Sequence, residues 1–162
     1  MRKWMALLMM VLLLCGCGAE ETWETISDEP VLEAMAQPRE ILVELPGEAA
    51  LPAMESEGQR LYVCEDYEIC LQTLNGGDLD RTVRTLSGYS LDAVTVMETS
   101  LQGIDRYEFV WVSAGEEGDR LGRGVILSDG GYHYTLTVLR DADTTEKSQI
   151  LWNDIFASFQ LV

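Results

Sequence analysis

The sequence predicts an α+β fold in which an antiparallel sheet carries a short helix and a long C-terminal helix. Four segments of the second half alternate polar with apolar residues or are rich in β-branched and aromatic ones, namely 94–99, 106–113, 122–127 and 132–139. Their connections, such as Gln102-Gly103, are too short for parallel crossovers, so the four strands form an antiparallel meander. An amphipathic segment with a helix-start signal ends the chain.

The first half of the domain predicts a strand, a hairpin and a short helix. A strand at 41–45 ends at Pro46-Gly47, a loop follows at 52–58, and segments 61–64 and 67–74 form the hairpin. Asp78 is a good N-cap for a helix over 79–86, and Gly88 suits the position after its end. A turn at 91–93 leads into the meander.

The C-terminal helix begins at a capping box, with Asp143 at the N-cap and Glu146 three residues later. Apolar residues recur along it at near-helical spacing: Ile150, Leu151, Trp152, Ile155, Phe156 and Phe159. Alternation in segment 132–139 puts Tyr134 on one face and His133 on the other. We therefore expect a sheet with one covered face, under this helix, and His133 on the solvent side.

The N-terminal segment has the features of a targeting signal. Arg2 and Lys3 precede an apolar run from Trp4 to Leu14, which is well short of the ~20 apolar residues that a membrane-spanning helix needs. Such a run is typical of the hydrophobic part of a signal peptide.

The end of this run, Leu14-Cys15-Gly16-Cys17, resembles the bacterial lipoprotein signal, in which an aliphatic residue and two small residues precede a cysteine. The resemblance implies a signal peptide at 1–16, transfer of a diacylglyceryl group to the Cys17 thiol, and cleavage after Gly16. It usually also implies acylation of the new amino terminus, with palmitate as a typical fatty acid. Cys15 fits less well, because the bulky Leu14 would stand where a small residue belongs. Several acyl chains bind a bilayer firmly, at ~0.8 kcal/mol per buried methylene.

The charge of the remaining chain limits its partners. The segment before Cys17 holds two of the 11 basic residues and none of the 28 acidic ones, which leaves 9 − 28 = −19. This charge argues against nucleic acid as a partner and against direct adhesion to anionic lipid. Residues 17–38, with many acidic residues and with Pro30 and Pro38, predict a lipidated cysteine on a flexible tether, and 39–162 predict one globular domain.

Two cysteines, Cys64 and Cys70, lie in this domain. An even pair outside the cytoplasm predicts a disulfide. If the hairpin pairs residue 65 with 69, Cys64 lies opposite Cys70 at a separation that a disulfide tolerates. Two free buried thiols are the second interpretation. A redox or metal-binding thiol pair is the weakest, since Cys-x-x-Cys spacing and a nearby histidine are lacking.

The order of elements and the closing Ile155-Phe156-Ala157-Ser158-Phe159 resemble the PsbP-like α/β/α sandwich, a fold of extrinsic photosystem II subunits and of many bacterial lipoproteins. The resemblance implies the fold and a non-catalytic accessory role, and it transfers no functional residue. A cystatin-like sheet with a packed helix is the alternative fold.

No residue pattern predicts catalysis or a metal site. His133 is the one histidine, with no orienting carboxylate or nucleophile evident beside it, and zinc would need more ligands. The acidic stretches 116–119 and 141–143 lack the glycine and glutamate spacing of a twelve-residue calcium loop. Large polar and aromatic residues of the meander are expected at core edges or on a partner-binding surface: Arg106, Tyr107, Trp111, Arg120 and Arg123.

These observations predict a non-catalytic, lipid-anchored binding or accessory protein on the extracytoplasmic face of a bacterial cell membrane. Its expected partners are the membrane, through Cys17, and an envelope protein, with no nucleic acid, metal or cofactor and no small-molecule ligand assigned. An envelope hydrolase that uses two close carboxylates and a calcium-dependent binding module are the alternatives.

Overall fold

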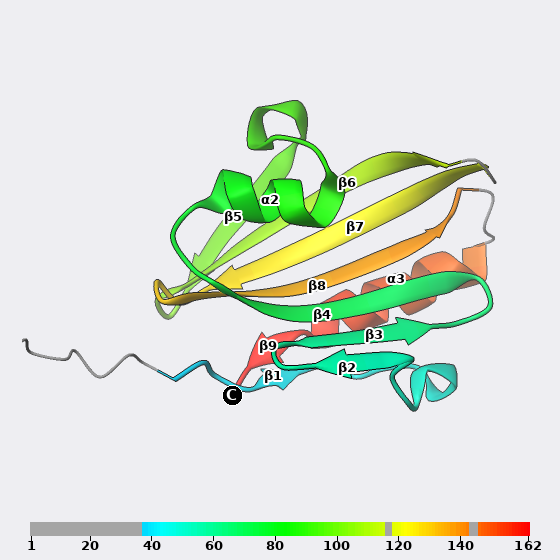
Figure 1. The fold of residues 1–162 in the computed structure, drawn as a ribbon, viewed down its shortest axis with the longest axis horizontal. Coiled ribbons are helices and arrows are strands. Elements are labelled where there is room, and N and C mark those ends of the chain that lie inside the picture. Colours follow the sequence, from blue (N-terminus) through cyan, green and yellow to red (C-terminus); the bar gives the residue numbers. More distant parts are fainter. Residues whose placement is uncertain (1–36, 116–117, 143–145) are drawn as a thin grey trace, which may run out of the picture. The chain divides into compact units, whose positions relative to one another are not determined.

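The computed structural model describes residues 37–115, 118–142 and 146–162, and these residues form an α+β fold (Figure 1). The main sheet has seven strands in the order β2-β3-β4-β8-β7-β6-β5, and every neighbouring pair is antiparallel. The strands are β2 Met54–Ser56, β3 Gln59–Val63, β4 Tyr67–Asn75, β5 Val96–Leu101, β6 Ile104–Gly115, β7 Gly118–Ser128 and β8 Tyr132–Asp141. The helices are α2 Leu79–Ser87 and α3 Glu146–Ser158.

The expected meander is confirmed, and two strands of the domain were missed. β2 lies in the segment expected to be a loop, and β9 (Gln160–Leu161) follows α3 directly. β9 pairs with β1 (Ile41–Leu42), so the expected first strand is only two residues long and stands outside the main sheet. Neither short segment has enough residues to show a two-residue periodicity, which is why the pattern did not reveal them.

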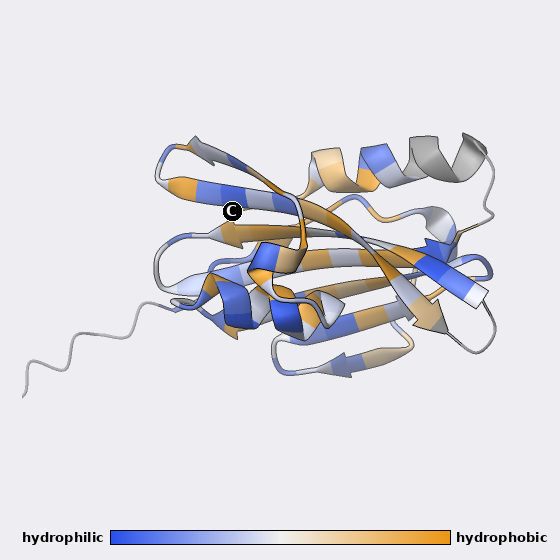
Figure 2. Ribbon diagram, turned by 90° about the horizontal axis from the view of Figure 1, so that it is seen from above, coloured by the Kyte–Doolittle hydropathy of each residue, from blue (hydrophilic) through white to orange (hydrophobic). Residues whose placement is uncertain are grey.

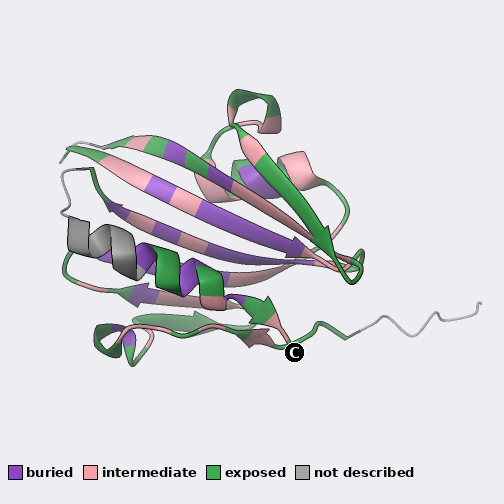
Figure 3. Ribbon diagram, turned by 180° about the vertical axis from the view of Figure 1, so that it is seen from behind, coloured by how far each residue is buried: buried purple, intermediate pink, exposed green. Residues whose placement is uncertain are grey.

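Both faces of the sheet are covered, which corrects the expectation of one covered face. Successive side chains of a strand point to opposite faces of the sheet, and the buried apolar side chains of each face form a separate core. Figure 2 shows the hydrophobic residues along the strands in orange. Leu136 and Val125 lie in the core beneath α3, whereas Ile126 lies in a smaller core beneath α2. The domain therefore has three layers, with α2 and α3 on opposite faces of the sheet (Figures 1 and 3). The finer PsbP-like assignment stays a prediction.

Helix α2 begins and ends where its local signals predict. The side chain of Asp78 accepts a hydrogen bond from the backbone N–H of Arg81 at 3.2 Å, as an N-cap does. Gly88 adopts a left-handed conformation with φ of 79° and donates its N–H to the carbonyl of Arg84 at 2.9 Å. Val83 is fully buried against the sheet.

Helix α3 has 13 residues, so it is of ordinary length and not the long helix expected. The predicted N-cap Asp143 lies outside the described residues. Trp152, Ile155 and Phe156 are buried in the larger core. Arg106 of β6 donates to the carbonyls of Phe156, at 2.9 Å, and Phe159, at 3.3 Å, and so binds backbone oxygens at the end of the helix.

Gly122 on β7 is required by an aromatic ring packed flat on the sheet. A Cβ atom at this position would lie 2.2 Å from Cε2 of Trp111, on the neighbouring strand β6. Trp111 is buried and stacks on Phe109, with ring centres 5.4 Å apart, so close packing restricts the movement of its ring. Glycine thus leaves the volume that the indole ring fills.

We expect Gly122→Ala to lower the free energy of unfolding by about 1–3 kcal/mol, because the new methyl group overpacks the core beneath α2. Gly47→Ala is the control, since no atom lies within 4 Å of a Cβ built there. Urea denaturation followed by circular dichroism measures both. Equal midpoints for the two variants would show that Trp111 can move aside at little cost.

Candidate functional site: the polar groove beside helix α2

A polar groove lies between helix α2 and the end of strand β4. Its volume is about 350 Å³, within the range of small-ligand sites, which is roughly 300–1,000 Å³. One face of α2 and the connection from β4 line it, through Leu74, Asn75, Gly76, Asp78, Arg81, Thr82 and Thr85. The N–H of Gly76 donates to the carbonyl of Gly131 at 2.9 Å, which holds the β4–α2 connection against the β7–β8 turn.

Arg81 is the cationic group of this groove. It forms no ion pair with any carboxylate in the part of the chain that the structure describes. Arg84, one turn further along α2, is instead paired with Asp80 at 2.9 Å. In a chain with 28 acidic and 11 basic residues, an exposed guanidinium in a groove is a ready donor to a carboxylate or another anionic group.

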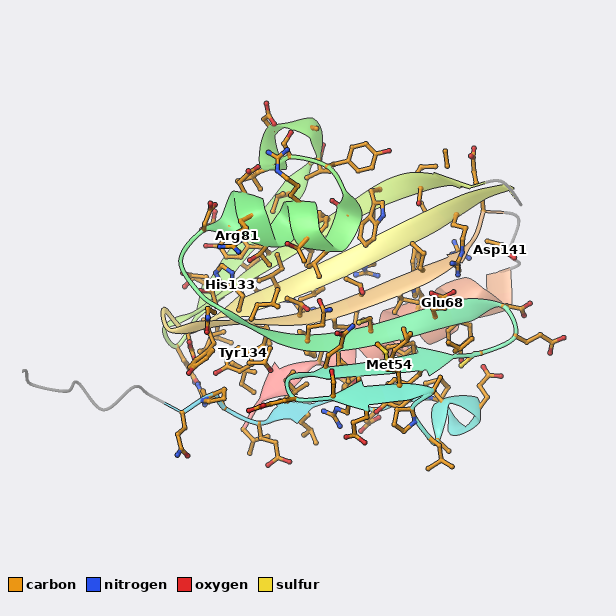
Figure 4. All side chains as sticks on the ribbon, in the orientation of Figure 1. Met54, Glu68, Arg81, His133, Tyr134 and Asp141 are labelled. Atoms are coloured by element: carbon orange, nitrogen blue, oxygen red, sulfur yellow. The ribbon has the colours of Figure 1, made fainter. Side chains whose placement is uncertain are left out.

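His133 lies beneath this groove and is buried, with 3% of its surface exposed, so the expectation that it faces solvent is wrong. Its Nδ1 lies 2.8 Å from Oγ1 of Thr82. The Thr82 hydroxyl also lies 3.3 Å from the carbonyl of Asp78, to which it donates when Nδ1 of His133 carries the proton. Figure 4 shows His133 and Arg81 at the end of the sheet opposite to Glu68 and Asp141.

This histidine joins α2 to β8, and its burial favours the neutral form. Burial lowers the pKa of His133, and the carboxylates of Asp129 and Asp78 offset that effect only in part. The distance to Thr82 resembles that of a base and its nucleophile, but Thr82 is buried, with 4% of its surface exposed. The pair therefore fixes the wall of the groove and does not present a nucleophile to it.

The expected disulfide between Cys64 and Cys70 is absent, and both are free thiols. The hairpin pairs Val63 with Glu68 and Leu61 with Cys70, so the register differs from the expected one. Because side chains alternate across a strand, Cys64 lies with the core beneath α3 while Cys70 lies on the opposite face. Gln59 donates to the sulfur of Cys70 at 3.6 Å.

The large residues expected at core edges or on a partner surface mostly bind other parts of the fold. Glu108 accepts hydrogen bonds from Arg106 at 2.7 Å and Arg123 at 3.0 Å. Burial raises the pKa of Glu108, but the two guanidinium groups outweigh burial and the pKa is lowered overall. Arg120 pairs with Glu68 at 3.0 Å, Tyr107 is half-buried, and Trp111 is buried.

The acidic stretches form no recognisable metal site in the described residues. Glu116, Glu117 and Asp143 lie outside these residues, and Asp141 is near Arg120, with 3.7 Å between Oδ1 and Nε. Within residues 37–115, 118–142 and 146–162, no three side chains of histidine, cysteine, aspartate or glutamate gather as metal ligands would.

The predicted cleavage site at Gly16 and lipidation site at Cys17 also lie outside the described residues. Among the described helices, none combines the length and the apolar character needed to cross a membrane.

The geometry above defines the class of protein: a small α+β domain with one helix on each face of an antiparallel sheet. No protein-family model matches the sequence, and no curated protein sequence matches it. Among solved structures, the fold is similar to that of LpqN, which is involved in cell envelope biogenesis of Mycobacterium tuberculosis. The TM-score is 0.49 and the identity 15%, and the match covers 78% of this chain and 87% of that one. A likeness at this level concerns the fold alone.

We expect the free energy of unfolding to fall as the pH decreases below ~6.5, the ordinary pKa of histidine. The pKa of His133 is depressed in the folded protein, so the unfolded chain binds the extra proton and stability rises with pH across this window. Urea denaturation at pH 7.5, 6.5 and 5.5 measures the slope.

His133→Gln should be less stable than the wild type at pH 7.5 but show a flatter pH dependence between pH 6.5 and 5.5. Glu108 and Asp129 do not interfere, because their lowered pKa values place their titration below this window. An unchanged slope in this variant would exclude His133 as the titrating group.

Proposed function

We propose that this protein is a lipid-anchored, non-catalytic binding module that presents its α+β domain at the extracytoplasmic face of a bacterial membrane. The observation that carries the proposal is the motif Leu14-Cys15-Gly16-Cys17 after a short apolar run with a basic start. The acidic segment that follows Cys17 would separate the domain from the lipid surface, because anionic lipid repels it.

The binding role is proposed for the groove beside α2. Its lining offers the guanidinium of Arg81 and the amide of Asn75, which can donate to an acidic group of a partner beside the carboxylate of Asp78. The lining hydroxyls of Thr82 and Thr85 lie within hydrogen-bonding distance of backbone carbonyls. Groups that could serve acid–base chemistry are instead occupied within the fold: His133 by Thr82, and Glu108 by two arginines. Asp129 likewise accepts hydrogen bonds from Tyr132 and Tyr134, at 2.8 Å each. These contacts favour binding over catalysis.

The anchor is tested with two neighbouring cysteines. Cys17→Ser should abolish incorporation of an alkyne-tagged fatty acid and move the protein from the detergent phase to the aqueous phase in phase partitioning. Cys15→Ser is the matched control and should keep both the label and the membrane association. Labelling that is lost in Cys15→Ser but kept in Cys17→Ser would reject the proposed lipidation site.

The groove is tested with two arginines on the same helix. In-cell cross-linking of the full chain should recover an envelope protein, and Arg81→Ala should reduce that recovery roughly tenfold, since a hydrogen bond to a charged group is lost. Arg84→Ala should leave recovery unchanged, because this exposed arginine lies in an ion pair with Asp80, its one such partner among the described residues. Equal recovery for both variants would place the partner's contact elsewhere on the domain.

A further inference from the structure

Strand β5 leaves one edge of the main sheet open. It is the last strand in the sheet order, and residues 97–101 of its six residues are exposed (Figure 3). In the described residues, no hydrogen bond reaches the outer edge of β5 from another element. Such an edge exposes unpaired backbone N–H and C=O groups that can accept another strand.

The turn after β5 determines which backbone groups point outward. Gln102 and Gly103 have φ of 54° and 79°, the sign that a type I′ turn requires at both central residues. Such a two-residue turn makes Leu101 and Ile104 a hydrogen-bonded pair. Hydrogen-bonded pairs recur at every second residue of an antiparallel strand, so Thr99 and Met97 also direct their backbone N–H and C=O groups toward β6. The outward groups therefore belong to Val96, Glu98 and Ser100.

The opposite edge of the sheet is not comparable. β2 has only three residues, and the segment around β1 lies beside it, since Glu40, Ile41, Glu55 and Ser56 line one small hollow between them. Short and flanked edge strands are a common protection against further pairing. β5 is twice as long, with Met97 59% exposed and Leu101 75% exposed on the same face.

We infer that β5 pairs with β5 of a second copy of this chain, antiparallel across a two-fold axis, with Thr99 facing Thr99 of the other copy. A two-fold axis perpendicular to the sheet pairs side chains that point to the same face, so one residue of β5 lies on the axis opposite its own copy. Two such registers align five residues of each strand: one has Glu98 on the axis and the other has Thr99. One places Glu98 opposite Glu98 of the other copy, a like-charge contact that is destabilising. The other places Glu98 opposite Ser100 and avoids this repulsion.

The chosen register is also complementary in its side chains. Met97 of each copy lies opposite Leu101 of the other, so the two most exposed apolar side chains of the strand cover each other. Glu98 and Ser100 form the hydrogen-bonded pairs, through the backbone groups that β6 leaves free. The part of the sheet face that α3 does not cover extends from β5 to β6, where the side chain of Val110 is 55% exposed. The pairing joins two seven-stranded sheets into one.

The net charge gives this association a distinctive salt dependence. Each chain has a formal net charge of −17, so two copies repel each other at low ionic strength. Salt screens this repulsion over a Debye length of ~8 Å at 0.15 M. The dimer should therefore become stronger as salt is added, whereas contacts that depend on opposite charges become weaker.

Cysteine cross-linking of the full chain tests the register. Thr99→Cys should form a dimer on a non-reducing gel after mild oxidation, because non-hydrogen-bonded pairs have Cα atoms ~4.5 Å apart. Ser100→Cys is the matched control on the same edge and should cross-link far less, since it faces Glu98. The wild-type chain carries all native cysteines and sets the background. Equal cross-linking of the two variants, or none above that background, would overturn the inference.

Sedimentation of the full chain in detergent tests the association without a cross-link. The wild type should show more dimer at 0.5 M than at 0.05 M sodium chloride. Ser100→Pro should weaken the dimer roughly tenfold, because it removes an outward N–H from each copy and none of the hydrogen bonds to β6. An unchanged urea midpoint confirms that this variant is folded. A folded Ser100→Pro variant that dimerises like the wild type would overturn the inference, as would a wild-type monomer at both salt concentrations.

Discussion

The central strands β7 and β8 carry the constraint on which the rest of the domain depends, because they bury both of their faces. Successive residues of β7, Val125 and Ile126, enter different cores and are both fully buried. A shift of the pairing by one residue would exchange the two sets of side chains, placing His133 under α3 and Leu136 under α2. The register of this pair therefore decides where both helices pack.

Helix α3 is held on its face of the sheet by charge as well as by apolar contact. Arg106 binds the carbonyls at the end of the helix, and the guanidinium of Arg123 lies 4.4 Å from the ring centre of Phe156. Glu108 accepts a hydrogen bond from each of these two arginines and offsets one of their two positive charges at a partly buried site. Scarce basic residues of an acidic chain are thus used to attach the helix.

Each helix is too narrow to cover its face completely, and the two uncovered regions differ in chemistry. Beside α2 the sheet end forms a polar groove, with Arg81 exposed and His133 fixing its wall. Beyond α3 the uncovered strands β5 and β6 expose apolar side chains and a free backbone edge. The proposed partner of the groove and the proposed second copy can bind together, because β4, which lines the groove, and the edge strand β5 are separated by three strands of the sheet.

Local signals in the sequence determined the class of fold, the meander strands and the bounds of α2, since alternation, turn residues and the caps Asp78 and Gly88 act over a few neighbouring residues. The N-terminal motif likewise predicts the anchor without any structure. Only the tertiary structure decided that Cys64 and Cys70 lie on opposite faces, that His133 is buried, and that Arg81 lines a groove. These outcomes depend on strand register and on which helix covers which face, and both are set by packing between residues far apart in the chain.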